Sequence, residues 1–521
     1  MAQVRQRNPR TGITYVYETE AYWDKEKKQS RYRDRRLVGH VDPESGQVVP
    51  NRPTTPRTTP GVGPARLFAG ATHLLTEIAG QIGLSHDLAV ALQDETAGQA
   101  VESFAQFLII EDPAPALRFD RWARTHTHPL GEPVSSQAWS DLFGLIGQTE
   151  LESFFTQRVR RASGRYWFFD TTSISSYSRQ LERVRWGHNK DGVALPQINL
   201  AVVKDAGTGL PLAFKDLPGS IPDVVLVTQL VADFARFGAG KMKLCMDRGF
   251  YSKTNVNAMM AAHLKFLIGV TLQAGYVKHA LTDHGHDLRS WDHYDPDREL
   301  YAMRIDYPWT DDEARPHTDD VHQTRRSYLC LYFDPNRAID EGKDFARLIA
   351  RLLRELTSGD TINEHKNLYT TYFHKVRGGW AGNDIAIEAE RARHGCFALL
   401  TNDASLDCWQ ALDIYRSKDQ IEKAFHDVKD RLNFRTTSVH NQETLTGKLF
   451  TVFTALILST ELRRRMTQSG LNKDYTMTGL IDELETIEQY HAPGHRPIVP
   501  HTTTKQNDIY ARLSVQPPTM S

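Results

Sequence analysis

Tyr166-Trp-Phe-Phe-Asp170 is a continuous apolar run that ends in a carboxylate, and Lys241-Met-Lys-Leu-Cys-Met-Asp247 repeats that pattern. Short apolar runs are typical of buried strands. A carboxylate that ends such a strand lies at the edge of a sheet, where a ligand can reach it. Either aspartate alone is more simply the first solvated residue after a strand. The polar residues that follow, Thr-Thr-Ser after Asp170 and Arg-Gly-Phe-Tyr after Asp247, instead favour tight exits into a site.

The segments around these two runs predict the rest of a sheet. Strands are expected at residues 196–203, 210–217 and 266–270, and helices at 222–237 and 253–262. The resulting order is three strands followed by helix, strand, helix and strand, which implies an α/β protein with a mixed sheet flanked by helices. This is also the order of the RNase H-like fold.

A third carboxylate, Glu422, belongs to a helix expected from about Leu406 to Leu432. Helix positions four or seven residues apart lie within roughly 40° of one another, so one stripe carries Tyr415, Lys418, Glu422, His426 and Lys429. An exposed Lys/Glu ladder would produce part of this stripe and is the simpler interpretation of the spacing alone. Apolar residues on an adjacent face allow the stripe to border a cleft instead: Ile421, Ala424, Phe425 and Val428.

Together these segments resemble the DDE transposases of bacterial insertion sequences, of the class with a Tyr-Arg-Glu-Lys (YREK) signature. Tyr415-x2-Lys418-x3-Glu422-x6-Lys429 has the spacing of that signature, with Lys418 in place of the arginine. Lysine is a point charge and lacks the bidentate fork that arginine offers to a phosphate. Five other short motifs carry the resemblance: Phe-Asp-Thr-Thr-Ser at 169–173, Pro-Gly-Ser-Ile-Pro-Asp at 218–223, Asp-Arg-Gly-Phe at 247–250, Leu-Thr-Asn-Asp at 400–403 and Ile-Glu-Lys-Ala-Phe at 421–425.

The resemblance implies an RNase H-like core in which Asp170, Asp247 and Glu422 are catalytic and hold two divalent metal ions. Carboxylate oxygens suit Mg²⁺ or Mn²⁺. Two such ions about 4 Å apart can activate the attacking oxygen and stabilise the leaving oxygen of a phosphoryl displacement. The implied function is cleavage at transposon ends and strand transfer into target DNA. The residues expected to contact DNA near the site are Tyr415, Lys418, His426, Lys429 and Arg248, although solvation alone also explains an exposed Arg248.

The N-terminal segment is locally basic. Residues 5–36 hold ten Lys/Arg and five Asp/Glu, whereas the whole chain has a formal net charge of -1. DNA must therefore bind through local patches, for which the candidates are Lys25, Lys27, Lys28, Arg31 and Arg33. A small solvated hairpin is an equal alternative. The expected partner is double-stranded DNA, namely terminal inverted repeats and target DNA, bound by a homodimer in a synaptic complex.

A chain of 521 residues fits about two to four domains. The expected organisation is a basic β-rich segment at 1–52, a Pro-rich linker at 53–65, a helical DNA-binding domain or scaffold bundle at 66–161, the first part of the core at 162–270, a β-rich insertion at 271–395, the second part with the Glu422 helix at 396–440, and a helical C-terminal region at 441–521 that becomes irregular after about 490. The apolar residues from Leu445 to Leu462 serve either as a core helix or as a dimer contact.

Two smaller features have simple interpretations. Trp380 lies on a Gly-rich turn in the insertion, where packing is simpler than stacking on a flipped DNA base. His284, His286 and His293 lie in a polar, acidic loop, which favours a surface location over a metal site.

Composition narrows the class of protein. Four scattered cysteines without a CxxC pair argue against a zinc knuckle or a disulfide framework and fit a reducing, bacterial-type cytoplasm. The first residues are charged, and no run approaches the roughly 18 apolar residues of a membrane span. Two alternatives to a transposase stay open: a DNA-binding descendant without strand-transfer activity, and an RNase H-like nuclease that only hydrolyses. The intact Asp-Asp-Glu set argues against the first.

Overall fold

A computed structural model describes residues 2–7, 13–24, 29–42, 46–50, 65–111, 116–162, 166–176, 184–185, 196–218, 243–310, 324–418, 436–437, 442–491, 497–499 and 501–518. The chain divides into two compact units, Met1–Arg66 with Tyr490–Ile498, and Leu67–Gln489 with Val499–Met520. The expected Pro-rich linker lies outside the described residues except for residue 65.

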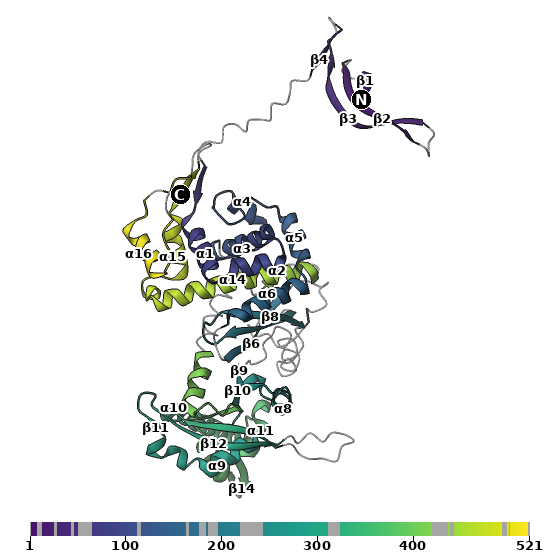
Figure 1. The fold of residues 1–521 in the computed structure, drawn as a ribbon. Coiled ribbons are helices and arrows are strands. Elements are labelled where there is room, and N and C mark those ends of the chain that lie inside the picture. The colour runs from purple at the N-terminus through teal and green to yellow at the C-terminus, as the bar shows by residue number, and fades with distance from the viewer. Residues whose placement is uncertain are drawn as a thin grey trace. The chain divides into compact units, whose positions relative to one another are not determined.

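The first unit is built on an antiparallel sheet, as the sequence predicts. Its four strands pair in chain order: β1 Ala2–Arg7, β2 Thr14–Asp24, β3 Gln29–Val41 and β4 Val48–Pro50 (Figure 1). Arg31 and Arg33 occupy β3 positions opposite Tyr22 and Glu20 of β2. Lys25, Lys27 and Lys28 lie outside the described residues.

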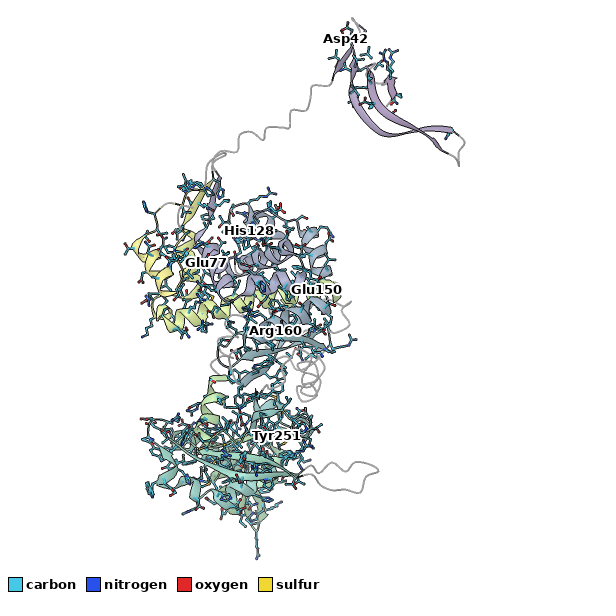
Figure 2. The ribbon with its side chains drawn as sticks, viewed as in Figure 1. Asp42, Glu77, His128, Glu150, Arg160 and Tyr251 are labelled. Atoms are coloured by element: carbon cyan, nitrogen blue, oxygen red, sulfur yellow. The ribbon has the colours of Figure 1, made fainter. Side chains whose placement is uncertain are left out.

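The second unit begins with the expected helical region. These are α1 Gly70–Gln81, α2 Leu84–Leu92, α3 Glu95–Ile110, α4 Phe119–Ala123, α5 Ser136–Leu145 and α6 Gln148–Arg161. The Ser135 side chain accepts a hydrogen bond from the Ala138 N–H and so caps the N-terminus of α5. At the start of α6 the Glu150 carboxylate accepts from the Gly147 N–H at 2.9 Å (Figure 2).

Helix α14, Gln442–Gln468, is the core of this helical region. It contacts α1, α3, α5 and strand β8, Pro211–Pro218 (Figure 1). Leu445, Phe450 and Leu462 are all fully buried. In the described part of the chain one helical segment, Thr444–Gln468, is long and apolar enough to cross a membrane, but 83% of its apolar window is buried inside the protein. The core alternative for Leu445 to Leu462 therefore holds, and these side chains are not free to form a dimer contact.

A large mixed sheet forms the rest of the second unit. Its strand order among the described residues is β11-β12-β13-β16-β10-β9-β6-β7-β8, with β17 Thr436–Thr437 beside β6. Strands β6 Tyr166–Ser176, β9 Lys243–Met246 and β10 Lys265–Val270 are parallel to one another. On the other side of β6, β7 Gln197–Asp205 pairs antiparallel with β6, and β8 pairs antiparallel with β7. Helix α8 Lys253–Ala261 links β9 to β10. This order is consistent with an RNase H-like transposase core; the helix expected at 222–237 lies outside the described residues.

The stretch expected as a β-rich insertion is more helical than predicted. Its two long strands, β12 Leu300–Thr310 and β13 Thr324–Phe333, extend the main sheet through β16 Cys396–Thr401, and β11 is Tyr294–Asp295. The remainder contains α9 Gly275–His284, α10 Pro335–Ser358, α11 Lys366–Tyr372, the hairpin of β14 Phe373–Val376 and β15 Gly379–Gly382, and α12 Asp384–Arg391. Helix α10 starts where the Asp334 side chain accepts from the Arg337 N–H.

The C-terminal region is also more ordered than predicted. Helix α15 Met477–Glu485 is followed by strand β18 Glu488–His491, which pairs with β5 Ala65–Phe68. Helix α16, Thr504–Arg512, lies in the stretch expected to be irregular. It is held by a capping box, in which Thr503 and Gln506 exchange side-chain and backbone hydrogen bonds.

Candidate active site

The two predicted catalytic aspartates lie on or directly after neighbouring parallel strands. Phe169 of β6 pairs with Met246 of β9 in the register, so residues 170 and 247 follow at the same level. Adjacent strands lie about 4.8 Å apart. The structure thus brings the backbones of Asp170 and Asp247 together, as expected for two carboxylates that share a site.

The two aspartates differ in one respect from the prediction. Asp247 directly follows β9 and begins a short 3-10 turn, Arg248–Phe250, as a tight exit should. Strand β6 instead continues through Ser176, and Asp170 pairs with Val202 of β7. The expected exit after Asp170 is therefore wrong, because β7 keeps supplying hydrogen-bond partners after β9 has ended.

One face of the sheet carries this site. Tyr166, Phe168 and Cys245 pack on that face with a helix that begins at residue 408 and is described to residue 418. Because side chains alternate along a strand, positions 170 and 247 continue the series of Phe168 and Cys245. The opposite face packs against the main hydrophobic core through Trp167, Phe169, Leu244 and Met246.

The helix after residue 408 brings the Tyr415 hydroxyl to Asp247. The hydroxyl group donates a hydrogen bond to Asp247 Oδ1, with 2.8 Å between the two oxygens. Lys418 Nζ lies 3.9 Å from the same oxygen, and the Lys418 side chain is only 1% exposed while that of Asp247 is 53% exposed. The ammonium also lies 5.5 Å from the centre of the Tyr415 ring. The predicted pair Tyr415 and Lys418 is therefore directly linked to a predicted catalytic carboxylate.

Opposing effects act on the pKa of Asp247. Burial raises it, but the Lys418 charge, the Tyr415 hydrogen bond and the backbone N–H and charge of Arg248 outweigh burial, and the net pKa lies below the usual value of 3.8. Asp247 is therefore ionised at neutral pH. An ionised, half-exposed carboxylate is the chemical form that a hard divalent cation binds.

Gly269 belongs to this site, although no motif pointed to it. A Cβ at this β10 position would lie 2.6 Å from the Tyr415 hydroxyl and 3.2 Å from the Arg248 nitrogen. Because Gly269 has no side chain, the Tyr415 hydroxyl can pass over β10 and reach Asp247. The available signal was a glycine inside the apolar run Phe266-Leu-Ile-Gly-Val270, since a glycine within a strand often marks a close approach.

A cavity of about 350 Å³ adjoins Asp247. Three arginines line it, namely Arg248, Arg337 and Arg416. Arg337 is paired with Glu341 at 2.6 Å, while Arg248 and Arg416 are exposed and form no ion pair with the described residues. Two uncommitted guanidinium groups beside a carboxylate suit a phosphate next to the reacting centre. Sequence reasoning named Arg248 but missed Arg416, which lies beside the signature stripe.

Several predicted site residues remain outside this geometry. Glu422, His426 and Lys429 are not among the described residues, and only the backbone of Asp170 is described. Within the residues that are described, no group of three or more His, Cys, Asp or Glu could hold a metal ion. This applies to His284, His286 and His293, of which His286 is fully exposed.

Trp380 lies away from the aspartates in sequence and packing. It stands opposite Lys375 in the β14–β15 hairpin and packs, half-buried, against the small cluster of Leu352, Tyr369 and Phe373. This contact agrees with the packing interpretation, and stacking on a DNA base stays a prediction.

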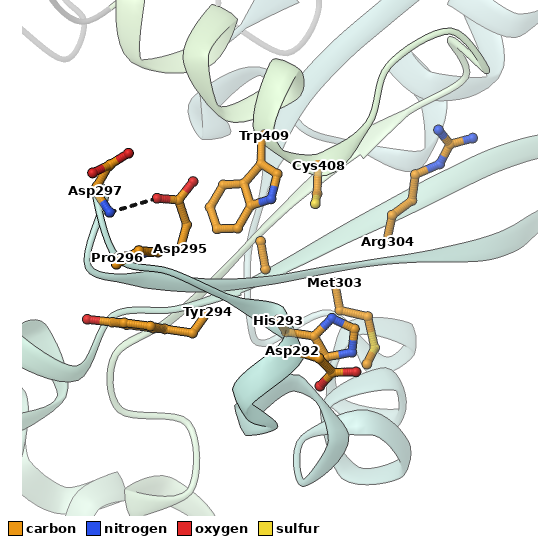
Figure 3. A pocket seen from close by; sticks show the side chains of 11 residues that line it. Asp292, His293, Tyr294, Asp295, Pro296, Asp297, Met303, Arg304, Cys408 and Trp409 are labelled. Atoms are coloured by element: carbon orange, nitrogen blue, oxygen red, sulfur yellow. Dashed lines mark hydrogen bonds between the residues drawn. The ribbon is translucent and has the colours of Figure 1, made fainter.

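A second cavity, of about 430 Å³, lies between the β11–β12 turn and the start of the helix at 408 (Figure 3). His293 lines it beside Asp292. Asp295 accepts a hydrogen bond from the Asp297 N–H at 2.9 Å and pairs with Arg298, so its charge is already compensated within the turn. The β11–β12 turn that lines this cavity is thus held by its own hydrogen bond and ion pair.

The Leu-Thr-Asn-Asp motif at residues 400–403 has a structural role. Asp403 accepts hydrogen bonds from Lys243 Nζ at 2.5 Å, from the Ser405 hydroxyl at 2.8 Å and from the Tyr166 hydroxyl at 2.8 Å. These bonds keep the pKa of Asp403 far below the usual range despite burial. Asn402 Oδ1 accepts from the Phe266 N–H. Tyr166 and Lys243 are the first residues of β6 and β9, so this network closes the end of the sheet opposite the aspartates.

Comparison with known proteins identifies the family of this chain. A family model described as "Transposase DDE domain" matches residues 165–458, which is more than half of the chain. The chain therefore belongs to the DDE transposase domain family. No curated protein matches the sequence.

Among solved structures, the chain is similar to a piggyBac transposase in a synaptic complex with hairpin DNA, determined by cryo-EM. The identity is 10% and the TM-score 0.37, over 80% of this chain and 76% of that chain. A similarity of this size does not establish a shared fold.

Proposed function

We propose that this protein is an active transposase of a bacterial insertion sequence, of the YREK class, which cleaves the ends of its element and joins them to target DNA. The observation that supports this most directly is the matched level of Asp170 and Asp247 on parallel strands, with Asp247 ionised and half exposed. The proposed third carboxylate is Glu422, which belongs to the helix expected from the sequence between about Leu406 and Leu432.

The residues at the site have separate roles in this proposal. Asp170, Asp247 and Glu422 would hold two Mg²⁺ or Mn²⁺ ions, which supply charge stabilisation and nucleophile activation when bound. The carboxylate donor set fits such hard cations. Tyr415 orients Asp247 through its hydroxyl, and buried Lys418 keeps that carboxylate ionised. A phosphate contact by Lys418 itself remains a prediction.

DNA is the proposed substrate, held by positive groups near the carboxylates and by the basic N-terminal segment. Arg248 and Arg416 would take a phosphate in the adjoining cavity. Lys429 and His426 would contact the end from the same helix stripe, and Lys25, Lys27, Lys28, Arg31 and Arg33 would bind more distant phosphates. A homodimer would hold two ends together in a synaptic complex.

The test compares cleavage with binding on a labelled duplex taken from the DNA that flanks the gene. Asp247→Asn and Glu422→Gln should abolish Mn²⁺-dependent nicking while end binding stays intact, because each removes a charge that holds the ion but no contact to phosphate. Lys429→Ala should weaken end binding and lower nicking through poorer positioning. Asp283→Asn, at an exposed position of α9, is the matched control and should behave as wild type.

Each other outcome identifies an alternative. Robust nicking by Glu422→Gln would remove Glu422 from the active site. Nicking without strand joining would indicate a nuclease. End binding without any metal-dependent cleavage by wild type would indicate a DNA-binding descendant.

A further inference from the structure

Gly269 occupies a position where glycine is otherwise unfavourable. Its neighbours in β10, Leu267, Ile268 and Val270, are almost completely buried. Glycine in a strand interior costs conformational entropy and leaves nothing to pack. Its φ is not positive, so the backbone does not require glycine here. What requires it is the space that its neighbours occupy: a Cβ would lie only 2.6 Å from the Tyr415 hydroxyl and 3.2 Å from the Arg248 backbone nitrogen.

The Tyr415 hydroxyl in turn acts on Asp247. Asp247 directly follows β9, and its carboxylate receives hydrogen bonds from the Tyr415 hydroxyl and the Arg248 backbone. These two donors restrict the carboxylate while leaving the side chain 53% exposed to a ligand. A methyl group at position 269 would push the hydroxyl away, because real Cβ contacts are essentially never as short as 3.0 Å.

We propose that Gly269 is a positioning residue: by admitting Tyr415 over β10, it sets the orientation in which Asp247 presents its carboxylate to a divalent cation. The cation site itself rests on the function proposed above. Lys418 supports this arrangement, since its buried ammonium lies near both the Tyr415 ring and Asp247. Groups that orient a metal ligand commonly change metal affinity by about 10- to 100-fold when removed.

The experiment measures Mn²⁺ binding to the DNA-free full-length protein by electron paramagnetic resonance, with Asp247→Asn defining the Asp247-dependent binding. Gly269→Ala and Tyr415→Phe should each weaken Mn²⁺ binding by about tenfold. The double variant should bind no more weakly than Tyr415→Phe, because the added methyl no longer has a hydroxyl to displace. Gly275→Ala, at an exposed position of α9, is the matched control, since a Cβ there meets nothing within 4 Å.

Thermal unfolding of the metal-free variants gives a second readout. Gly269→Ala should lower the midpoint by about 2–4 °C, and Tyr415→Phe should restore part of that decrease in the double variant. The proposal would be overturned if folded Gly269→Ala bound Mn²⁺ with wild-type affinity. It would also be overturned if the decreases in the unfolding midpoint of the two single variants simply added in the double variant.

The two proposals fail in different ways. If Asp247→Asn binds Mn²⁺ as wild type does, the proposed metal site is wrong. The coupling of Gly269 to Tyr415 is then decided by the unfolding midpoints alone: partial restoration in the double variant upholds the positioning contact, and additive decreases reject it.

Discussion

At the scale of single residues, the surroundings of each carboxylate decide its charge at neutral pH. Asp247 is partly buried, yet a lysine and two hydrogen-bond donors lower its pKa. Glu102 of α3 is 2% exposed and has no cation among the causes of its shift. Burial therefore prevails over the hydrogen bonds from Ser85 and Gln106, and the pKa of Glu102 rises to about 7.

Glu102 leads to a prediction about stability and pH. The pKa of Glu102 in the folded protein, about 7, exceeds the ordinary value of 4.5. The protonated side chain's contribution to the free energy of unfolding is therefore fully present below pH 4.5 and is lost as the pH rises through about 7. The difference corresponds to roughly 3 kcal/mol. Glu102→Gln should remove this dependence and raise the urea midpoint near pH 8 by an amount equivalent to about 1–3 kcal/mol. The new amide can also reach Gln106 Oε1, which is buried without a partner in the described structure.

The control for Glu102 is Glu77→Gln, an exposed position of α1 (Figure 2). Urea unfolding of wild type and both variants between about pH 5 and pH 9 makes the measurement. A Glu102→Gln curve that falls with pH as steeply as wild type would show that Glu102 does not hold its proton in the folded state.

At the scale of elements, α14 depends on a close backbone contact with α5. A Cβ at Gly447 would lie 2.5 Å from the Phe143 Cα. The helices can approach this closely because glycine has no side chain there. The contact brings the aromatic residues of α14, Phe450 and Phe453, against Phe154 and Phe155 of α6.

Two glycines of these helices should therefore respond in opposite ways to alanine. Gly447→Ala forces α14 from α5 and should cost about 1–3 kcal/mol. Gly144→Ala, in α5, meets nothing within 4 Å and should be neutral or stabilise by up to about 1 kcal/mol. Thermal unfolding compares them, and equal midpoints would mean that the α5–α14 contact relaxes without cost.

At the scale of the whole molecule, charge is distributed unevenly between the units. The chain has a net charge of -1, whereas residues 5–36 carry an excess of five positive charges, ten minus five. DNA affinity that depends on this segment should be strongly sensitive to salt, because each neutralised phosphate releases counterions.

Neutralising Lys25, Lys27, Lys28 and Arg31 together should weaken end binding and reduce the slope of log K against log salt by about 0.9 for each phosphate that is no longer neutralised. Binding titrations at several salt concentrations make the measurement. Deletion of residues 2–50 is the companion variant, and it should reduce the slope at least as much while the helical content of the second unit is retained. An unchanged slope in the quadruple variant would show that this segment is not a DNA-binding module.

Local patterns in the sequence determined much of this protein. The apolar runs before Asp170 and Asp247, the N-cap at Ser135 and the helix at α8 were all readable, because burial periodicity and caps depend on residues close in the chain. The succession of these elements along the chain also predicted a mixed sheet. Glu422 and Lys429 were predicted from their spacing to Tyr415 and Lys418 along a helix, and both lie outside the described residues.

Only the tertiary structure decided how distant segments meet. Tyr415 and Asp247 are 168 residues apart, and the glycine that lets them touch lies on a third element. Strand β6 runs past Asp170 because β7 continues beside it, and β12 and β13 join the main sheet because β16 offers them an edge. The apolar residues of α14 could equally have formed a dimer contact; their burial among α1, α3 and α5 decided for the core. Hydrophobicity specifies that such faces are covered, but which partner covers them is set by contacts that no local pattern encodes.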